Sequence, residues 1–438
     1  MNDRTYYLNI FKVSEPQLQT LTATALAHGG DYCDLYFEHT TFFNLLLKDG
    51  VVSSGGFHTD FGVGIRVLKG EKTGYAYSEN TEMTDMLNAA RAASAIATGS
   101  SAGGRTYAKV ADRKSDFYPM KENWRAKGAD SFLPFMKDLE TAVFSKDSRI
   151  VKVIIRMSDS VCDVMMYNSL GELTYETRPM GSVTVTAVFQ QNGKTENRSV
   201  SRSFRTGAEL IGPALLDELA EDVVKGIDER FEAIRPKGGQ MSVVMGAGAS
   251  GILLHEAMGH AFEADFNRKG QSIFSEKMGQ QVCPKGISVV DDGTLASNRG
   301  SGNYDDEGVS GEKTYMIHDG VLCSYLHDRI SASWYGVTPT GNGRRENFRY
   351  NPIPRMRATY MESGNADSEG IVASVKKGIY VDEFSNGQVK IGEGAAVAAA
   401  EDEAPAQKTA FPWGLILQAI LWGFAMLMTP CVFPMVPM

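Results

Sequence analysis

Alternating apolar and polar residues predict an antiparallel sheet in the first part of the chain. Between residues 31 and 78, apolar side chains recur at every second position, and the turn signals KDG (48–50) and KGE (69–71) separate these runs. Such alternation is typical of strands with one buried face, and short turns containing glycine join antiparallel neighbours. The stretch 83–97, MTDMLNAARAASAIA, loses the alternation, and we expect it to form a helix.

A similar order of elements recurs further along the chain. A helix over residues 132–145 precedes a run of expected strands, and a long amphipathic helix follows over residues 209–234. The strands are expected at residues 149–157, 161–168, 172–177, 181–190 and 195–204. Helices packed beside antiparallel sheets define an α+β architecture. We therefore expect an α+β fold of antiparallel sheets flanked by helices.

A glycine-rich segment, GAGASG (246–251), follows an expected strand over residues 240–245 and precedes a helix. This context fits the dinucleotide-binding fingerprint. That fingerprint also requires a parallel βαβ unit with an acidic residue at the end of its second strand, about twenty residues on. The acidic residues found there, Glu263 to Asp265, lie in or just past the same helix. We therefore favour a plain strand-to-helix turn over a nucleotide site.

Two histidines bracket a glutamate in the apolar stretch LLHEAMGHAFEADF (253–266). His255 and His260 are five residues apart, which leaves side chains ~140° apart on a regular α-helix, whereas a spacing of four leaves them ~40° apart. Either they are incidental polar residues of a core-facing helix, or the helix contains one additional residue. A π-bulge of one residue would turn both imidazoles to one side, and Gly259 would ease that distortion. The pair could then hold Zn²⁺ while Glu256 accepts a proton from the attacking water.

The composition narrows the functional classes. The chain has 438 residues and a net charge of −9, so it lacks the basic surface typical of nucleic-acid binding. Its N-terminus has no charged region followed by an apolar run, and its five cysteines form no CxxC pair. We therefore expect no export signal, no disulfide framework and a cytoplasmic location. The cysteines are Cys33, Cys162, Cys283, Cys323 and Cys431.

The C-terminal end differs from the rest of the chain. From Thr409 to Met438 there is no charged residue, and the run exceeds the ~20 apolar residues that span a bilayer. Two tryptophans and a proline-rich exit favour a transmembrane segment over residues 411–438, in preference to a buried core helix. Residues 394–410 are dominated by Ala, with Glu and a Pro among them, and we expect an Ala/Glu/Pro linker there.

Several sequence blocks resemble the TldD branch of the TldD/PmbA family of metalloproteases, whose signature is HExxxH. The first block is HEAMGHAFEADFNRKGQSIFSEKMGQ (255–280). Further blocks follow in the expected order: DDEG (305–308), GVLCSYLHDR (320–329) and TGNGRRENFRYNPIPRMRATYM (340–361). The resemblance covers about residues 1–392. It implies a two-domain architecture, with an N-terminal domain over 1–235 and a truncated C-terminal metalloprotease domain over 236–393.

The resemblance also implies a function. It makes His255 and His260 ligands of Zn²⁺, or of another divalent transition metal, and Glu256 the catalytic base. The implied substrates are unfolded or modified peptides. They would be cleaved inside a chamber formed with a PmbA-type partner subunit, or in a homo-oligomer.

Other polar residues have competing interpretations. The carboxylates of residues 305–307 are expected to be structural turn residues in preference to active-site neighbours. Arg344 and Arg345 lie in a glycine-rich loop and could hold the carbonyls or carboxylate of a peptide, unless that loop is simply solvated or part of an interface. His318 and His327 are expected at the surface or in an interface.

The final part of the chain departs from the family pattern. Family members continue past the equivalent of residues 378–394, and their last segment carries a cysteine that supplies the third metal ligand. We expect that ligand to be missing here, and with it full peptidase activity, because a catalytic zinc site usually has three protein ligands. Glu263 or Asp265 could take its place, whereas Cys283 and Cys323 have no spacing that supports this role.

The tail over residues 411–438 resembles the start of the transmembrane domain of DsbD-type thiol–disulfide interchange proteins, in which TPCVFPMVPM holds the first redox cysteine. Cys431 has no second thiol on a later helix, so disulfide exchange by it alone is not expected. We expect a chimera of two genes joined near residue 393, in preference to a tail-anchored protease. Two rival functions remain: a non-catalytic PmbA-like scaffold subunit, or a fragment of a membrane thiol–disulfide interchange protein.

Overall fold

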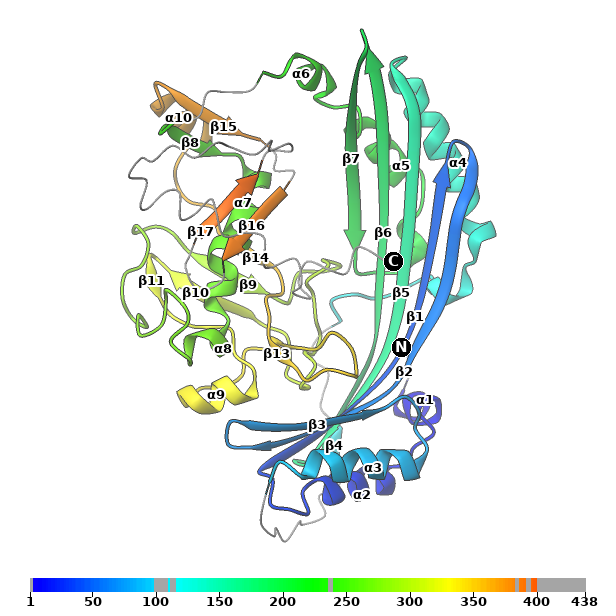
Figure 1. The fold of residues 1–438 in the computed structure, drawn as a ribbon, viewed down its shortest axis with the longest axis vertical. Coiled ribbons are helices and arrows are strands. Elements are labelled where there is room, and N and C mark those ends of the chain that lie inside the picture. Colours follow the sequence, from blue (N-terminus) through cyan, green and yellow to red (C-terminus); the bar gives the residue numbers. More distant parts are fainter. Residues whose placement is uncertain are drawn as a thin grey trace, which may run out of the picture. The chain divides into compact units, whose positions relative to one another are not determined.

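The computed structural model describes residues 3–97, 116–234 and 239–382, together with the backbone of residues 109–110, 386–390 and 395–399. The chain divides into two compact units (Figure 1). Unit 1 comprises residues 1–237, 295–301 and 347–351, and unit 2 comprises residues 238–294, 302–346 and 352–438. Two short segments from the second half of the chain thus belong to unit 1.

Unit 1 is built on a seven-stranded, largely antiparallel sheet. The strand order is β3-β2-β1-β5-β6-β4, and β7 pairs with a second part of β6. Its strands are β1 Tyr32–Lys48, β2 Val51–Lys69, β3 Lys72–Ser78, β4 Lys109–Val110, β5 Ile150–Asn168, β6 Glu172–Gln191 and β7 Lys194–Phe204. The predicted antiparallel sheet is confirmed. The two expected groups of strands form a single sheet because β1 pairs with β5 from Asp34↔Asn168 to Lys48↔Ile154.

The strands of the second group are longer than the sequence pattern predicts. Strand β5 spans two expected strands, and β6 spans two more. The apolar alternation is interrupted in mid-strand by half-buried polar residues, such as Ser158, whose hydroxyl lies 2.8 Å from that of Ser182 on β6. Asp163 of β5 is fully buried and forms an ion pair with Arg125, while the hydroxyl of Thr177 of β6 donates to it at 2.6 Å. A buried polar group satisfied in this way does not end a strand.

Helices pack against both ends of this sheet (Figure 1). Near one end, α1–α3 cover β1 and β2, and towards the other end, α4–α6 pack with β5–β7. The helices are α1 Arg4–Ile10, α2 Glu15–Ala25, α3 Met83–Ser94, α4 Ala129–Lys146, α5 Pro213–Asp222 and α6 Ile227–Glu232, with short 3₁₀ turns η1 Trp124–Ala126 and η2 Ala208–Leu210. The predicted helices over 83–97 and 132–145 are confirmed as α3 and α4.

The expected continuous helix over residues 209–234 is wrong. It is divided into η2, α5 and α6. Pro213 occupies the start of α5, where its fixed φ is tolerated, and Gly226 adopts a left-handed backbone with φ of 73° between α5 and α6. The apolar periodicity of the sequence continues across the break between α5 and α6, so the pattern alone does not indicate that break.

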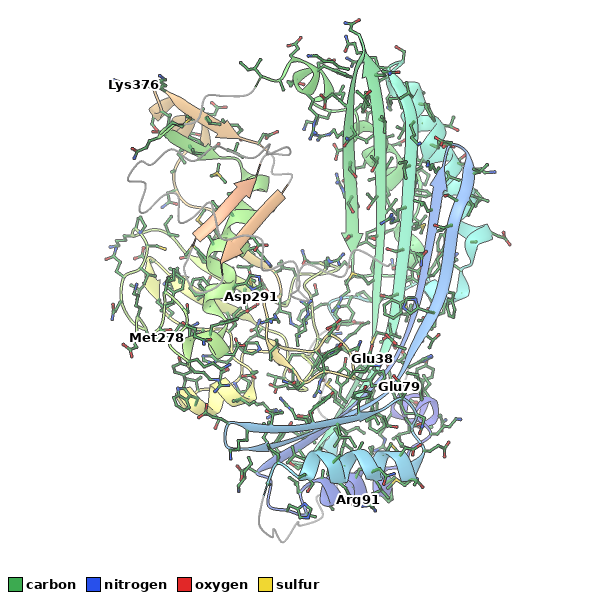
Figure 2. The ribbon with its side chains drawn as sticks, viewed as in Figure 1. Glu38, Glu79, Arg91, Met278, Asp291 and Lys376 are labelled. Atoms are coloured by element: carbon green, nitrogen blue, oxygen red, sulfur yellow. The ribbon has the colours of Figure 1, made fainter. Side chains whose placement is uncertain are left out.

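Residues 347–351 are fastened to the sheet of unit 1. The backbone N–H of Phe348 donates to the carboxylate of Glu38, which is labelled in Figure 2, at 2.8 Å, and the hydroxyl of Tyr75 donates to the carbonyl of Phe348 at 2.6 Å. Arg349 forms ion pairs with Asp60 and Glu79 at 3.1 and 3.0 Å. The Phe348 ring is fully buried.

Unit 2 contains several small sheets and short helices. Its largest sheet has the order β11-β10-β9-β14, and β8 pairs in parallel with β15. The strands are β8 Ser242–Met245, β9 Val289–Asp292, β10 Lys313–His318, β11 Val321–Leu322, β12 Gly343–Arg344, β13 Ile353–Pro354, β14 Thr359–Met361, β15 Gly378–Val381, β16 Asn386–Lys390 and β17 Ala395–Ala399. The helices are α7 Ala247–Leu254, α8 Ala264–Asn267, α9 Arg329–Tyr335 and α10 Ser368–Ser374.

The C-terminal expectations fall largely outside the described residues. Ala395–Ala399, within the expected linker, forms strand β17 and pairs with β16. The expected transmembrane segment over residues 411–438 is not described. Within the described part of the chain, no helix is both long and apolar enough to cross a bilayer.

The packing of Phe348 gives a first prediction. A methyl group at Gly62 would lie 2.3 Å from the Phe348 ring and 2.4 Å from the carbonyl oxygen of Ser78. We expect Gly62→Ala to lower the free energy of unfolding by about 1–3 kcal/mol, as overpacking does elsewhere. Urea denaturation measures this change. Gly56→Ala in the same strand is the control, because its methyl group would meet only the Asn44 side chain, at 3.3 Å. Equal stability of the two variants would contradict the expected clash.

Candidate metal centre

The GAGASG segment forms a strand-to-helix turn, as favoured from the sequence. Strand β8 ends at Met245, Gly246 caps α7, and the backbone N–H of Gly246 donates to the carbonyl of Val381 at 2.7 Å. A methyl group at Gly246 would lie 2.8 Å from the hydroxyl of Tyr380. This glycine therefore allows the start of α7 to approach β15 closely.

Helix α7 continues directly into two non-α turns. A π-helical turn, η3, spans His255–Gly259, and a 3₁₀ turn, η4, spans His260–Phe262. The predicted π-bulge is confirmed. A π turn bonds residue i to residue i+5, so a five-residue spacing returns to the same side of the segment. Strands β14, β16 and β17 lie against η3.

The π turn brings the two imidazoles together. The ring centroids of His255 and His260 are 5.1 Å apart, and their planes meet at 83°. Two imidazoles that bind one tetrahedral zinc ion at about 2.1 Å place their centroids about 5 Å apart. The ring spacing thus matches that of two imidazoles on one metal ion.

Contrary to the expectation from the sequence, Gly259 does not ease a backbone distortion. Its φ of −54° and ψ of −52° are ordinary helical values, so no special backbone freedom is used. A methyl group at this position would instead lie 2.1 Å from Sδ of Met356, which is buried. Glycine is required here because β13 and β14 are joined by a loop that places Met356 against the turn.

Burial sets the protonation of the groups in this centre. Burial, together with the nearby His260 and the Arg344 guanidinium, lowers the pKa of His255 to about 4. His255 is therefore neutral at pH 7, the form that binds metals. Burial also raises the pKa of Glu256, against the opposing influence of His260. Glu256 is thus a stronger base than an exposed glutamate.

A partner of His260 was missed by the sequence analysis. His260 is 4% exposed, and its Nδ1 lies 3.1 Å from Oε1 of the fully buried Glu263. The signal was the separation of three residues, since side chains three apart eclipse one another in a 3₁₀ turn. From the sequence, Glu263 was expected instead as a possible replacement metal ligand.

The described residues do not bring a third protein ligand to the two histidines. No group of three or more His, Cys, Asp or Glu side chains within them could hold one metal ion. Cys283 packs at the margin of the apolar core of unit 2, and Cys323 is exposed with its thiol directed to the carbonyl of Val321. These two thiols thus remain outside the centre.

The two arginines of the glycine-rich loop have different positions. Arg344 is half-buried, and its charge acts on His255, so it belongs to the surroundings of the centre. Arg345 is buried, and its backbone N–H donates to the carboxylate of Asp306 at 2.7 Å. Arg345 is therefore part of the framework that shapes the loop.

The carboxylates of residues 305–307 are structural, as expected. All three are buried, and each accepts a backbone N–H from another segment. Asp305 accepts from Gly343 at 2.9 Å, and Glu307 accepts from Arg329 at 2.8 Å. These bonds fix the loop that carries Arg344.

His318 and His327 differ in burial. His318 is exposed, as expected. The surface position expected for His327 is wrong, because this residue is 3% exposed and its ring lies 5.4 Å from that of Tyr335. The turn before α9 folds the side chain inward, and its Nδ1 lies 3.4 Å from the hydroxyl of Ser331.

Comparisons with known proteins cover most of the chain. Residues 33–97 match the PmbA/TldA metallopeptidase domain 1, residues 122–230 the central domain and residues 238–404 the C-terminal domain. The "Metalloprotease TldD homolog" of Haemophilus influenzae is 34% identical over 377 residues, or 84% of this chain and 77% of that protein. The "Zinc metalloprotease TldD homolog" of Saccharolobus solfataricus is 30% identical over 201 residues, 43% of this chain and 44% of that protein. The crystal structure of TldE from Thermococcus kodakarensis has a TM-score of 0.67 at 16% identity, covers 89% of this chain and 85% of that one, and is similar in fold.

The contact between Gly259 and Met356 gives a prediction about the π turn. We expect Gly259→Ala to lower the free energy of unfolding by about 1–3 kcal/mol through overpacking, and Met356→Ala to lower it by about 2–5 kcal/mol through a cavity. The double variant should lose less than the sum, because the added methyl group enters the space that Met356 leaves. A double-mutant cycle measured by urea denaturation tests this coupling. Strictly additive losses would show that the two side chains do not compete for one space.

The buried His327 gives a prediction about acid stability. Histidine has a pKa near 6.5 in an unfolded chain, whereas burial lowers the pKa of His327 in the folded protein to about 4, despite the nearby Asp328. Between these two values the unfolded state binds a proton that the folded state does not, so stability falls as the pH falls. We expect the free energy of unfolding of His327→Gln to decline less than that of the wild type between pH 7 and pH 4, by up to about 3 kcal/mol.

Urea denaturation at several pH values measures this difference for wild type and variant. The exposed His318 offers the control, and His318→Gln should follow the wild-type pH profile. If the free energy of unfolding fell equally for His327→Gln and the wild type as the pH falls, the expected effect of burial would be contradicted.

Proposed function

The chain belongs to the PmbA/TldD family of metallopeptidases, and from this premise we propose that it is a zinc-dependent peptidase with its centre at His255, Glu256 and His260. The observation that supports the proposal most strongly is the π turn η3. It brings the imidazoles of two histidines that are five positions apart to a ring-centroid distance of 5.1 Å. A glutamate with a raised pKa lies between them in the sequence. An α-helical turn with the same residues would separate them.

His255 and His260 would hold the metal. The lowered pKa of His255 favours this because metal ions bind the neutral imidazole. A bound zinc ion would supply a Lewis acid for the polarisation of a peptide carbonyl. The name of the relative from Saccharolobus solfataricus supports zinc as the metal.

Glu256 would serve as the general base. Its carboxylate takes a proton from the attacking water and can return it to the nitrogen of the departing peptide. Arg344, close enough to act on the charge of His255, would attract a carbonyl or carboxylate of the substrate. The proposed substrates, unfolded or modified peptides, follow from the family resemblance.

The strength of metal binding is part of the proposal. A catalytic zinc ion usually has three protein ligands, and the described residues supply two imidazoles. We therefore propose impaired activity for the chain alone, and a gain of activity with a PmbA-type partner subunit or in a homo-oligomer. Metal content should accordingly be measured for the chain alone and for the chain with such a subunit.

The role of Glu256 gives the functional prediction. We expect Glu256→Gln to reduce hydrolysis of an unfolded test peptide by about 10²–10⁴-fold, because the amide cannot accept the proton. Zinc content should remain that of the wild type, since the imidazoles are unchanged. The measurements are peptide cleavage by mass spectrometry and metal content by atomic emission on the same samples.

Glu369→Gln is the matched control, since Glu369 is an exposed glutamate in the first turn of α10. It should retain wild-type cleavage and wild-type zinc content. Wild-type cleavage by Glu256→Gln would remove the proposed base. Absence of zinc from the wild type, alone and with its partner subunit, would remove the proposed metal centre.

A further inference from the structure

His260 is the better fixed of the two histidines. It is 4% exposed, and its Nδ1 lies 3.1 Å from Oε1 of Glu263, a residue with no exposed surface. Within the described residues, no such hydrogen bond is formed by the ring of His255. The change of helix type explains this difference: the π turn aligns residues five apart, and the following 3₁₀ turn aligns residues three apart.

Glu263 is itself held in place by a buried arginine. Nη1 of Arg355 donates to Oε2 of Glu263 at 2.8 Å, and the Arg355 side chain is 10% exposed. Each oxygen of the Glu263 carboxylate therefore has a partner: the imidazole on one side and the guanidinium on the other. A buried carboxylate satisfied in this way keeps a fixed orientation.

A chain of buried hydrogen bonds anchors Arg355. Its backbone N–H donates to the carbonyl of Asn342 at 2.9 Å, and the Asn342 amide donates back to the carbonyl of Arg355 at 2.9 Å. The same amide donates to Asp291 at 2.7 Å. Asp291, on strand β9, is 1% exposed and lies in the interior of unit 2 (Figure 2). These hydrogen bonds thus connect Glu263, through Arg355 and Asn342, to strand β9 of the largest sheet of this unit.

We propose that Glu263 is a positioning residue for His260 and that Arg355 fixes its carboxylate. With Glu263 accepting from Nδ1–H, the Nε2 lone pair of His260 is free of a proton and available to a metal. This inference rests on the proposed metal centre, because it assigns Nε2 of His260 to the metal. It gives Glu263 an orienting role through its contacts with His260 and Arg355, in place of the replacement-ligand role considered from the sequence.

Arg355 can donate hydrogen bonds but cannot accept them. The near-isosteric variant Glu263→Gln therefore tests the positioning role of Glu263. In Glu263→Gln, Arg355 can only donate, so it selects the amide oxygen of the glutamine. The glutamine NH₂ group is then turned towards His260, where it can only donate to Nδ1. The imidazole is thereby driven to the opposite tautomer, with the proton on Nε2, the nitrogen that would bind the metal.

Two measurements on the full chain test the proposal. The first is the ¹⁵N spectrum of metal-free protein labelled at its histidines, with His260→Gln to assign the His260 signals. We expect the Nδ1–H tautomer of His260 in the wild type and the Nε2–H tautomer in Glu263→Gln. The second is zinc affinity by competition with a chelator, which should fall by about 10- to 100-fold in Glu263→Gln, as for other residues that orient metal-binding histidines.

Glu276→Gln is the control, because Glu276 is an exposed glutamate of the same unit, and it should change neither reading. A wild-type His260 in the Nε2–H form would overturn the proposal even if Glu263→Gln failed to fold. Equal zinc affinity of wild type and Glu263→Gln would overturn it as well. A wild type that binds no zinc but has the Nδ1–H tautomer would instead defeat the proposed metal centre and retain the positioning role of Glu263.

Discussion

His255 and His260 are five positions apart in the sequence, and one metal ion can contact both only where the backbone departs from the α-helical repeat. The backbone departs twice in succession, first in the π turn His255–Gly259 and then in the 3₁₀ turn His260–Phe262. A 3₁₀ turn is frequent where an α-helix ends, but a π turn is rare, so tertiary packing must select the π turn. Met356 lies against Gly259, and Phe262 stacks on Phe274 with ring centroids 4.6 Å apart.

The same packing explains why so many charged groups are buried in unit 2. A charge removed from water is tolerated only when it is paired and hydrogen-bonded. The carboxylates of residues 305–307 accept backbone N–H groups of other segments, and Asp291 accepts the hydroxyl of Thr359 at 2.7 Å and the amide of Asn342. These bonds connect short strands and loops that have few backbone hydrogen bonds to neighbouring strands. The centre depends on this framework for the positions of Arg344 and Glu263.

Local patterns predicted those features that depend on spacing along the chain. The antiparallel strands, the helices α3 and α4 and the π turn at His255–Gly259 all follow from periodicity or from its interruption. The union of the two expected sheets could not be predicted, because it depends on pairing between β1 and β5, more than a hundred residues apart. The break of the expected helix at Gly226 was hidden because apolar periodicity continued through it.

In the candidate site, too, spacing along the chain predicted some features, and contacts between distant residues determine the others. His255, Glu256 and His260 became candidates through their spacing and received their expected roles from the family resemblance, whereas the roles of their neighbours depend on contacts across the fold. The partnership of Glu263 with Arg355 joins residues 92 positions apart. The burial of His327 results from the packing of Tyr335 on the following helix. No pattern within a short window of sequence contains such information.

The most direct test of the account is anomalous diffraction at the zinc edge from crystals of the full chain loaded with zinc. We predict one zinc ion per chain, with a nitrogen of His255 and Nε2 of His260 each about 2.1 Å from it. A zinc ion bound to only one of these histidines, or bound elsewhere in the chain, would contradict it.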